Sequence, residues 1–467
     1  MAPSGFVERL AASCAPGVLL TGDGIGPRYF TDVVGRTGAL PRAVLRPSTT
    51  AEVSRLVAAC HAEGVPVVTQ GGMTGLVGGT LPNADEIVLS LERMNRIDEI
   101  DTGSGTATVE AGAVLQTVQD RVEARGFTFP LDLGARGSCT IGGNIATNAG
   151  GNRVIRYGMM RDLVLGLEVV MADGTVIDAL RKYIKNNAGF DVKQYFIGSE
   201  GTLGIVTRAV LRIFPKPGER AVACCSLSGF AAVVALLAHA RRLLGGDLTA
   251  FEVMWNAYYA RAAALPHARA PLRADRPFYV LVEASGADAE RTRAGFETVL
   301  SQALADGLIE DAVVAKSEAD AAALWRIRDA SLEVHAAVMP AVGFDVSLAI
   351  EAMEEFAAKV GEAAGALDPE ALVLLFGHLG DGNLHVIVHH AQAPADVGGR
   401  LEERIYDLVG AFGGSISAEH GIGIAKRPYL GRSRTSAEIA LMRSIKMAVD
   451  PKGILNPGRV IAIERRS

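Results

Sequence analysis

The sequence predicts an α+β fold built from two domains and a C-terminal segment. Its 467 residues exceed the size at which a single hydrophobic core stops growing. From about residue 47 to 217, helical periodicity alternates with short apolar strands, and beyond residue 218 longer strands alternate with amphipathic helices. Pro215, Pro217 and Gly218 punctuate the chain between these two parts.

The first predicted domain covers residues 1–218, with its core beginning at about residue 40. Its alternation of helix and strand favours a βα-type architecture. The expected elements are a helix over 50–64, strands within 66–72, 86–91 and 106–115, a helix over 115–126, a hairpin over 167–177 that turns at Asp173-Gly174, and a closing strand within 205–219.

The second predicted domain covers residues 219–415. A helix over 230–244, a strand over 278–285 and a strand pair over 372–378 and 384–390 indicate an antiparallel sheet with helices packed on one face. Residues 416–467 are expected to be mainly helical and to fold back onto the first domain.

Composition excludes several classes of protein. The formal net charge is −6, so no chain-wide basic field exists to bind nucleic acid. The five cysteines show no CxxC spacing, which favours a reducing compartment. No stretch approaches the roughly 20 apolar residues needed to span a bilayer. We therefore expect a cytoplasmic protein without a transmembrane segment, and peripheral attachment to a membrane stays open.

Two glycine-rich segments, 70–79 and 130–151, point to an anionic cofactor. Glycines allow positive φ and close backbone approach, so that consecutive N–H groups converge on a pyrophosphate, and Thr74 and Thr147 add hydroxyl donors. Either segment alone could be ordinary turns, but two in one domain favour the cofactor. A GxGxxG fingerprint between a strand and a helix is missing, which disfavours NAD.

These segments also carry a resemblance to a known family. The stretches PLDLGARGSCTIGGNIATNAGG, RYG, FIGSEGTLGIVT and DPKGILNPG resemble FAD-linked oxidases of the vanillyl-alcohol oxidase type, in the D-2-hydroxyglutarate and D-lactate dehydrogenase branch. The similarity runs from about residue 40 to 460. It implies a two-part FAD-binding domain, an α+β substrate (cap) domain with an antiparallel sheet, and a flavin ring between the two domains.

The resemblance implies a set of FAD contacts. No histidine lies in either glycine segment, so we expect non-covalent FAD. The implied contacts are Gly71, Gly72, Thr74, Gly75, Pro130, Gly142, Asn144, Thr147, Asn148, Gly204, Ile205 and Asn456.

The stretch from Gly377 to His385 predicts a metal site. A type I′ turn at Asp381-Gly382 would pair His378 directly with His385, with their Cβ atoms about 5 Å apart on one face. Such a pair alone is more often a polar surface pair. Glu419 would complete a three-ligand site with an open position, and the resemblance implies the same three ligands. Zinc is the first choice, with manganese and iron as alternatives.

The resemblance also implies the reaction, which is oxidation of a D-2-hydroxy acid to the 2-oxo acid by hydride transfer to flavin. His420, next to a predicted ligand, is the expected general base. Arg328 matches the family arginine that binds the substrate carboxylate, although the pattern alone suits a solvated helix charge. Asn383 could add a donor. The other histidines, including His335 and His389, are expected to have no role in the site.

The distal part of the substrate pocket departs from the D-2-hydroxyglutarate dehydrogenases. Their threonine and lysine that hold the distal carboxylate correspond here to Leu332 and Gly343, neither of which donates a side-chain hydrogen bond. We therefore expect a preference for short or apolar D-2-hydroxy acids such as D-lactate, D-2-hydroxybutyrate or D-mandelate, because a buried unpaired carboxylate is costly. D-2-hydroxyglutarate is the alternative.

Other features stay open at this level. The electron acceptor could be a quinone, an electron-transfer flavoprotein or a cytochrome, and a homodimer is the commonest default for an oligomer. An enzyme of the alkylglycerone-phosphate synthase type, which uses FAD without net electron transfer, would have histidine where Glu419 stands. A flavin-binding subunit of a multi-protein oxidase, without its own catalysis, is a third reading.

Overall fold

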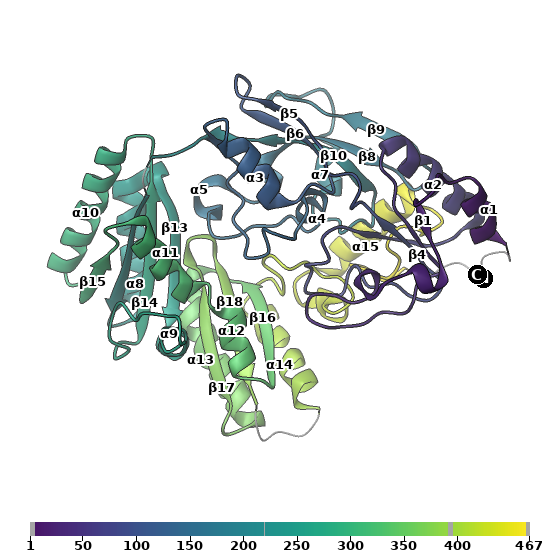
Figure 1. Ribbon diagram of the computed structural model, residues 1–467. Helices are drawn as coiled ribbons and strands as arrows, with labels where there is room; N and C mark the ends of the chain where they lie inside the picture. The colour runs from purple at the N-terminus through teal and green to yellow at the C-terminus, as the bar shows by residue number, and fades with distance from the viewer. Residues whose placement is uncertain (1–4, 219, 391–395, 464–467) are drawn as a thin grey trace. The chain divides into compact units, whose positions relative to one another are not determined.

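The computed structural model describes residues 5–218, 220–390 and 396–463 (Figure 1). These residues form two compact units. Unit 1 comprises the chain up to Gly151, Gly158–Pro215 and the chain from Glu419 on, and unit 2 comprises Asn152–Tyr157 and Lys216–Ala418. The prediction had kept residues 152–157 in the first domain. In the structure, Arg156 donates to the Ser285 carbonyl, a contact that no sequence pattern reveals.

Unit 1 begins with a small sheet in the order β1-β2-β4-β3. Its strands are β1 (Leu19–Leu20), β2 (Ala43–Leu45), β3 (Val67–Gln70) and β4 (Ile87–Ser90). The last three strands are parallel, because helix α2 (Thr50–Glu63) crosses back between β2 and β3. Thr49 caps the start of α2, and Gly64 ends it with a φ of 66°.

The second sheet of unit 1 is antiparallel throughout, in the order β5-β6-β10-β8-β9. Its strands are β5 (Ile97–Asp101), β6 (Thr106–Glu110), β8 (Val164–Val170), β9 (Val176–Ala179) and β10 (Ile205–Arg212). The expected βα-type architecture therefore holds only for β2 to β4. The predicted turn at Asp173-Gly174 joins β8 to β9, with Gly174 at a φ of 89°.

The remaining elements of unit 1 cover and close these sheets. They are α1 (Phe6–Ala12), η1 (Gly22–Gly24), η2 (Pro27–Tyr29), α3 (Leu115–Glu123), β7 (Phe127–Thr128), α4 (Ile141–Ala146), α6 (Met160–Leu163), α7 (Lys193–Phe196), β11 (Phe214–Pro215), η6 (Arg427–Arg432) and α15 (Ser436–Val449). The chain after α15 returns to β3, where the N–H of Val67 donates to Ile454 and the N–H of Asn456 donates to Val67. Arg459, 1% exposed, pairs with the buried Glu86, which fixes the C-terminal segment to unit 1.

Unit 2 contains a seven-stranded sheet, antiparallel throughout, in the order β15-β12-β14-β13-β17-β18-β16. Its strands are β12 (Arg220–Leu227), β13 (Leu248–Trp255), β14 (Phe278–Ser285), β15 (Asp311–Val314), β16 (Ala341–Ser347), β17 (Leu372–His378) and β18 (Asn383–His389). The expected antiparallel sheet of the second domain is therefore present, with β17 and β18 near its edge.

Helices cover both faces of this sheet, and not one face as expected. One face, with Cys224, Met254 and Phe376, forms an apolar cluster with α9 (Asn256–Ala263), α11 (Glu318–Arg328) and α12 (Ser331–Ala337). The side chains at the alternate positions of these strands point to the other face of the sheet, which is buried as well. That face packs against α8 (Phe230–Leu244), α10 (Ala289–Ala305), α13 (Met353–Leu367) and α14 (Val397–Ala411).

The short elements α5 (Val154–Tyr157), η3 (Gly245–Asp247), η4 (Ile350–Ala352) and η5 (Leu379–Asp381) complete unit 2. Among the residues described, every helix is too short or too polar to cross a membrane.

Candidate functional site

The hairpin of β17 and β18 carries both predicted histidine ligands, but in a different register from the predicted one. Phe376 lies opposite His385, so His378 lies two residues further along its strand. The turn is longer than two residues, because Leu379–Asp381 form a 3₁₀ turn and Gly382 follows with a φ of 83°. A type I′ turn needs a positive φ at both central residues, and here the Asp381 side chain instead accepts the Asn383 N–H at 3.2 Å.

The two histidines still share one face of the sheet. A shift of two residues preserves the face, whereas a shift of one would reverse it. The His378 and His385 rings are diagonal neighbours with centroids 5.3 Å apart and planes at 78°. The predicted direct opposition of His378 and His385 is therefore wrong, although the two side chains lie on the same face.

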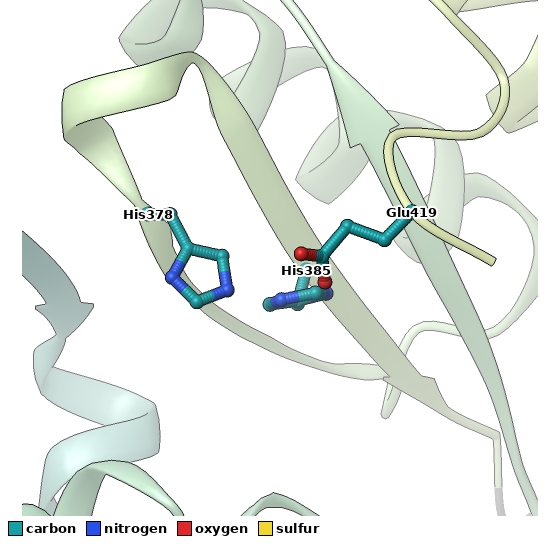
Figure 2. A group of neighbouring side chains, drawn as sticks. All are labelled: His378, His385 and Glu419. Atoms are coloured by element: carbon teal, nitrogen blue, oxygen red, sulfur yellow. The ribbon is translucent and has the colours of Figure 1, made fainter. Parts of the chain in front are cut away.

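Glu419 reaches the same place through the chain that follows unit 2's last helix. Ser415 bridges to Ser347 at the end of β16, and the Ala418 N–H donates to the Asp345 carbonyl at 3.4 Å. Ligand atoms of His378, His385 and Glu419 all lie within 4.8 Å of one another, and Figure 2 shows the carboxylate beside the imidazole rings. Two imidazoles and a carboxylate suit zinc, with a fourth position left for substrate.

Each imidazole has a buried carboxylate behind it. Glu252 on β13 lies 2.9 Å from Nδ1 of His378, and Asp345 on β16 lies 3.6 Å from Nδ1 of His385. Metal-binding histidines commonly have such a carboxylate on the nitrogen that does not bind the metal. The sequence analysis missed both carboxylates. The available signal was a single acidic residue inside each apolar strand, in LTAFEVMW and AVGFDVS.

Arg328 is buried beside this cluster and is not a solvated helix charge. It is 6% exposed at the end of α11. Its Nε donates to Glu252 at 2.7 Å, and its Nη2 lies 2.9 Å from Nε2 of His378. Burial alone would raise the pKa of Glu252, but the charge of Arg328 and the hydrogen bonds from His378 and Arg328 lower it. Burial likewise disfavours the charged form of Arg328, but Glu252 raises its pKa.

Asn383 does not offer the free donor that was predicted. Its Nδ2 donates to Asp345 Oδ1 at 2.8 Å and to the Val346 carbonyl at 3.0 Å. An amide NH₂ has two hydrogens, so both are engaged, one by Asp345 and the other by Val346. Asn383 therefore fixes the carboxylate behind His385. His420 follows Glu419 directly and is partly buried.

The two predicted substrate-pocket residues lie on neighbouring elements of unit 2. Leu332, on α12, is 79% exposed, so its side chain lines no enclosed pocket in this structure. Gly343, on β16, lies opposite Ile387. A Cβ added at Gly343 would lie 3.3 Å from Cε1 of His335. The imidazole of His335, for which no role was expected, therefore covers the space beside Gly343.

The first glycine segment has the features of an anion cradle. Among the described residues, no protein acceptor receives the amide N–H groups from Gly71 to Val77. A Cβ at Gly71 would lie 2.4 Å from Oγ1 of Thr140, and a Cβ at Gly72 would lie 2.0 Å from the Ser138 carbonyl oxygen. These two glycines therefore let the two segments pack together, and the amides after them are available for a phosphate.

The second glycine segment contributes a buried donor. Asn144, 4% exposed on α4, leaves its Nδ2 without a protein partner. A buried unpaired donor is costly, so a bound group that supplies an acceptor fits this position. Together with the open amides of the first segment, this donor makes unit 1 suited to an anionic cofactor.

The other predicted cofactor contacts have structural partners within unit 1. The side chain of Asn456 accepts the Thr69 N–H at 2.9 Å and donates to the Glu200 carbonyl at 2.6 Å. Asn148 accepts the Arg161 N–H at 2.9 Å. Thr147 Oγ1 donates to the Gly143 carbonyl. A Cβ at Gly142 or Gly204 would clash with neighbouring atoms, and Pro130 and Ile205 are buried. Thr74 and Gly75 belong to the open loop of the first glycine segment.

Comparisons with known proteins agree with these features. Residues 41–180 match the model of an FAD binding domain, and residues 216–460 match the C-terminal domain of FAD linked oxidases. The mitochondrial D-2-hydroxyglutarate dehydrogenase of Bos taurus is 42% identical over 90% of this chain and 77% of its own length. That of Xanthomonas citri pv. viticola is 40% identical over 92% of each chain. A Schizosaccharomyces pombe protein named as a D-lactate dehydrogenase is 38% identical over 89% of this chain and 81% of its own length.

Solved structures share the fold at low sequence identity. A p-cresol methylhydroxylase with substrate bound has a TM-score of 0.79 at 16% identity, covering 99% of this chain and 98% of its own. An alkyldihydroxyacetonephosphate synthase has a TM-score of 0.76 at 18% identity, covering 98% and 86%. The predicted α+β fold of the vanillyl-alcohol oxidase type is thereby confirmed. The chain belongs to the FAD-linked oxidase family, in the branch whose members carry the names D-2-hydroxyglutarate dehydrogenase and D-lactate dehydrogenase.

Proposed function

We propose that the protein is an FAD- and metal-dependent dehydrogenase that oxidises a D-2-hydroxy acid to the 2-oxo acid. The observation that carries this proposal is the cluster of His378, His385 and Glu419, with the Arg328 guanidinium 2.9 Å from His378. A site with two imidazoles, a carboxylate and an arginine suits a substrate that bears a hydroxyl beside a carboxylate.

The chain's own residues divide the work of this reaction. When bound, FAD supplies the hydride acceptor and the divalent metal supplies a Lewis acid that acidifies the hydroxyl. Arg328 binds the substrate carboxylate through guanidinium N–H groups that Glu252 leaves unused. His420 removes the hydroxyl proton as general base. His378, His385 and Glu419 would hold the metal, with zinc first and manganese or iron as alternatives.

The FAD is proposed to be non-covalent, held by the open amides after Gly72, by Asn144 and by the neighbouring loop residues. Acid precipitation should therefore leave a colourless pellet and release the flavin into the supernatant, because neither glycine segment contains a histidine. Absorbance of the two fractions checks this, and flavin that stays with the denatured polypeptide would contradict it.

The metal proposal predicts about one divalent ion per chain in the dialysed protein. His385→Ala should lose the ion and keep FAD, because it removes one of three ligands outside the glycine segments. His389→Ala is the matched control, since it lies on the same strand but interacts with the Pro340 carbonyl. Elemental analysis checks both variants, and equal metal content in the two would exclude His385 as a ligand.

The base proposal predicts that His420→Asn keeps the metal and FAD but slows flavin reduction roughly 10²- to 10⁴-fold, the usual size of general base catalysis. Rapid-mixing measurements of flavin absorbance under anaerobic conditions give the rate. An unchanged rate would assign the proton to another group.

The substrate is proposed to have a short or apolar side chain, as in D-lactate, D-2-hydroxybutyrate or D-mandelate. Leu332 and Gly343 supply no donor for a distal carboxylate, and Ile387 lies opposite Gly343. D-2-hydroxyglutarate is the second candidate, favoured by the names of the relatives and by His335, whose imidazole lies near Gly343 and could donate to a second carboxylate.

Anaerobic titration of the flavin with a panel of D-hydroxy acids decides between these substrates. The first candidate predicts the higher catalytic efficiency for D-lactate or D-mandelate, and a tenfold advantage for D-2-hydroxyglutarate would contradict it. In that case His335→Ala should raise KM for the diacid alone. Absence of bleaching with every acid would favour a flavin-binding subunit of a multi-protein oxidase.

The surroundings of the reaction are proposed from general arguments. The electron acceptor is a quinone, an electron-transfer flavoprotein or a cytochrome, and a homodimer is the default assembly. All five cysteines are free thiols, which supports a reducing compartment such as the cytoplasm, with peripheral membrane attachment left open.

A further inference from the structure

We infer that Glu252 is a positioning residue that sets both the metal affinity and the substrate affinity of the site, by holding His378 and Arg328 with its two carboxylate oxygens. This inference rests on the proposed function and adds to it a residue outside the predicted ligands and catalytic groups. Glu252 is 1% exposed on β13, directly opposite His378 in the sheet.

Glu252 and Arg328 together fix the tautomer of His378. A carboxylate only accepts hydrogen bonds and an arginine only donates them. Nδ1 lies 2.9 Å from Glu252 Oε1, so it must carry the proton. Nη2 of Arg328 lies 2.9 Å from Nε2 and 3.1 Å from Nδ1, and because Nδ1 donates to Glu252, only Nε2 has a lone pair that can accept from the guanidinium. Glu252 therefore keeps the lone pair of His378 on Nε2, where a metal would bind in place of the hydrogen bond from Arg328.

Glu252 also holds Arg328 in place. Its Nε donates to the other oxygen of Glu252 at 2.7 Å, and the carbonyl of Arg328 accepts from the buried Tyr258 hydroxyl at 2.8 Å. A buried guanidinium needs a counter-charge. The partly exposed Asp329 lies 3.6 Å from Nη1, and Glu252 is the buried carboxylate that supplies the charge at Nε. Because Nη2 contacts His378, the same carboxylate fixes the arginine next to the metal ligand.

Glu283 provides a matched control for a purely structural role. It is also 1% exposed, lies on the neighbouring strand β14 and contacts the same helix, α11, through Trp325 Nε1 at 2.9 Å. Its arginine partners are Arg220, at 3.2 Å, and Arg153, at 3.7 Å. Glu283 faces the same apolar cluster, since its strand partner Ala250 lies two residues before Glu252. Its removal should therefore disturb the fold similarly without reaching His378.

The test compares Glu252→Gln with Glu283→Gln in the FAD-containing protein. The zinc dissociation constant is measured by competition with a chromophoric chelator. We expect zinc affinity to fall about 10- to 100-fold in Glu252→Gln, the usual cost of removing a carboxylate behind a metal-binding histidine, and to stay within about twofold in Glu283→Gln. KM for the preferred hydroxy acid should rise in Glu252→Gln alone, because Arg328 loses its anchor.

The outcomes separate this inference from the proposed function. Wild-type protein that binds no zinc at this site overturns the proposed function and the inference with it. Tight zinc binding in wild type, together with equal affinity in the two variants, overturns the inference alone. If Glu252→Gln loses FAD or does not fold, Glu252→Asp replaces it. This variant keeps the negative charge but moves it away from His378 by one methylene. Its zinc affinity should fall by more than the twofold range of the control, and an affinity equal to that of the wild type would overturn the inference.

Discussion

The candidate site depends on the register of four neighbouring strands in unit 2. In the order β13-β17-β18-β16, Glu252 lies opposite His378, and His385 lies opposite both Phe376 and Asp345. Opposed residues share a face, so two carboxylates and two imidazoles form a polar row on one face, stepped by two residues between His378 and His385. A one-residue slip in any of these pairs would send a member of the row to the other face.

This row is embedded in an apolar environment, which makes its charges costly. The same face carries Met254, Phe376 and Ile387 in the cluster beneath α9, α11 and α12. Burying charges is repaid only where hydrogen bonds and opposite charges satisfy them. Arg328 supplies the opposite charge for Glu252, and Asn383 donates to Asp345. A sequence that keeps such a row inside a core departs from simple packing, and such departures are expected at functional sites.

The sequence predicted more of the parts than of their arrangement. The two-domain α+β organisation, the hairpin at Asp173-Gly174 and the antiparallel sheet followed from local periodicity and turn residues. The antiparallel second sheet of unit 1 and the helices on both faces of the unit 2 sheet did not, because strand pairing depends on long-range contacts that periodicity does not encode. His378 and His385 were paired on one face but in the wrong register, because the Asx contact of Asp381 lengthens the turn. Glu252 lies 126 residues from His378, beyond any local pattern.

We propose that a metal held by His378, His385 and Glu419 is required for oxidation of the hydroxy acid. The most direct measurement is the anaerobic rate of flavin reduction in chelator-treated protein that retains FAD, before and after stoichiometric zinc, manganese or iron is added back. We expect the rate to collapse without metal and to return with one equivalent of the proper ion, while FAD stays bound. Rapid flavin reduction in demonstrably metal-free protein would contradict it.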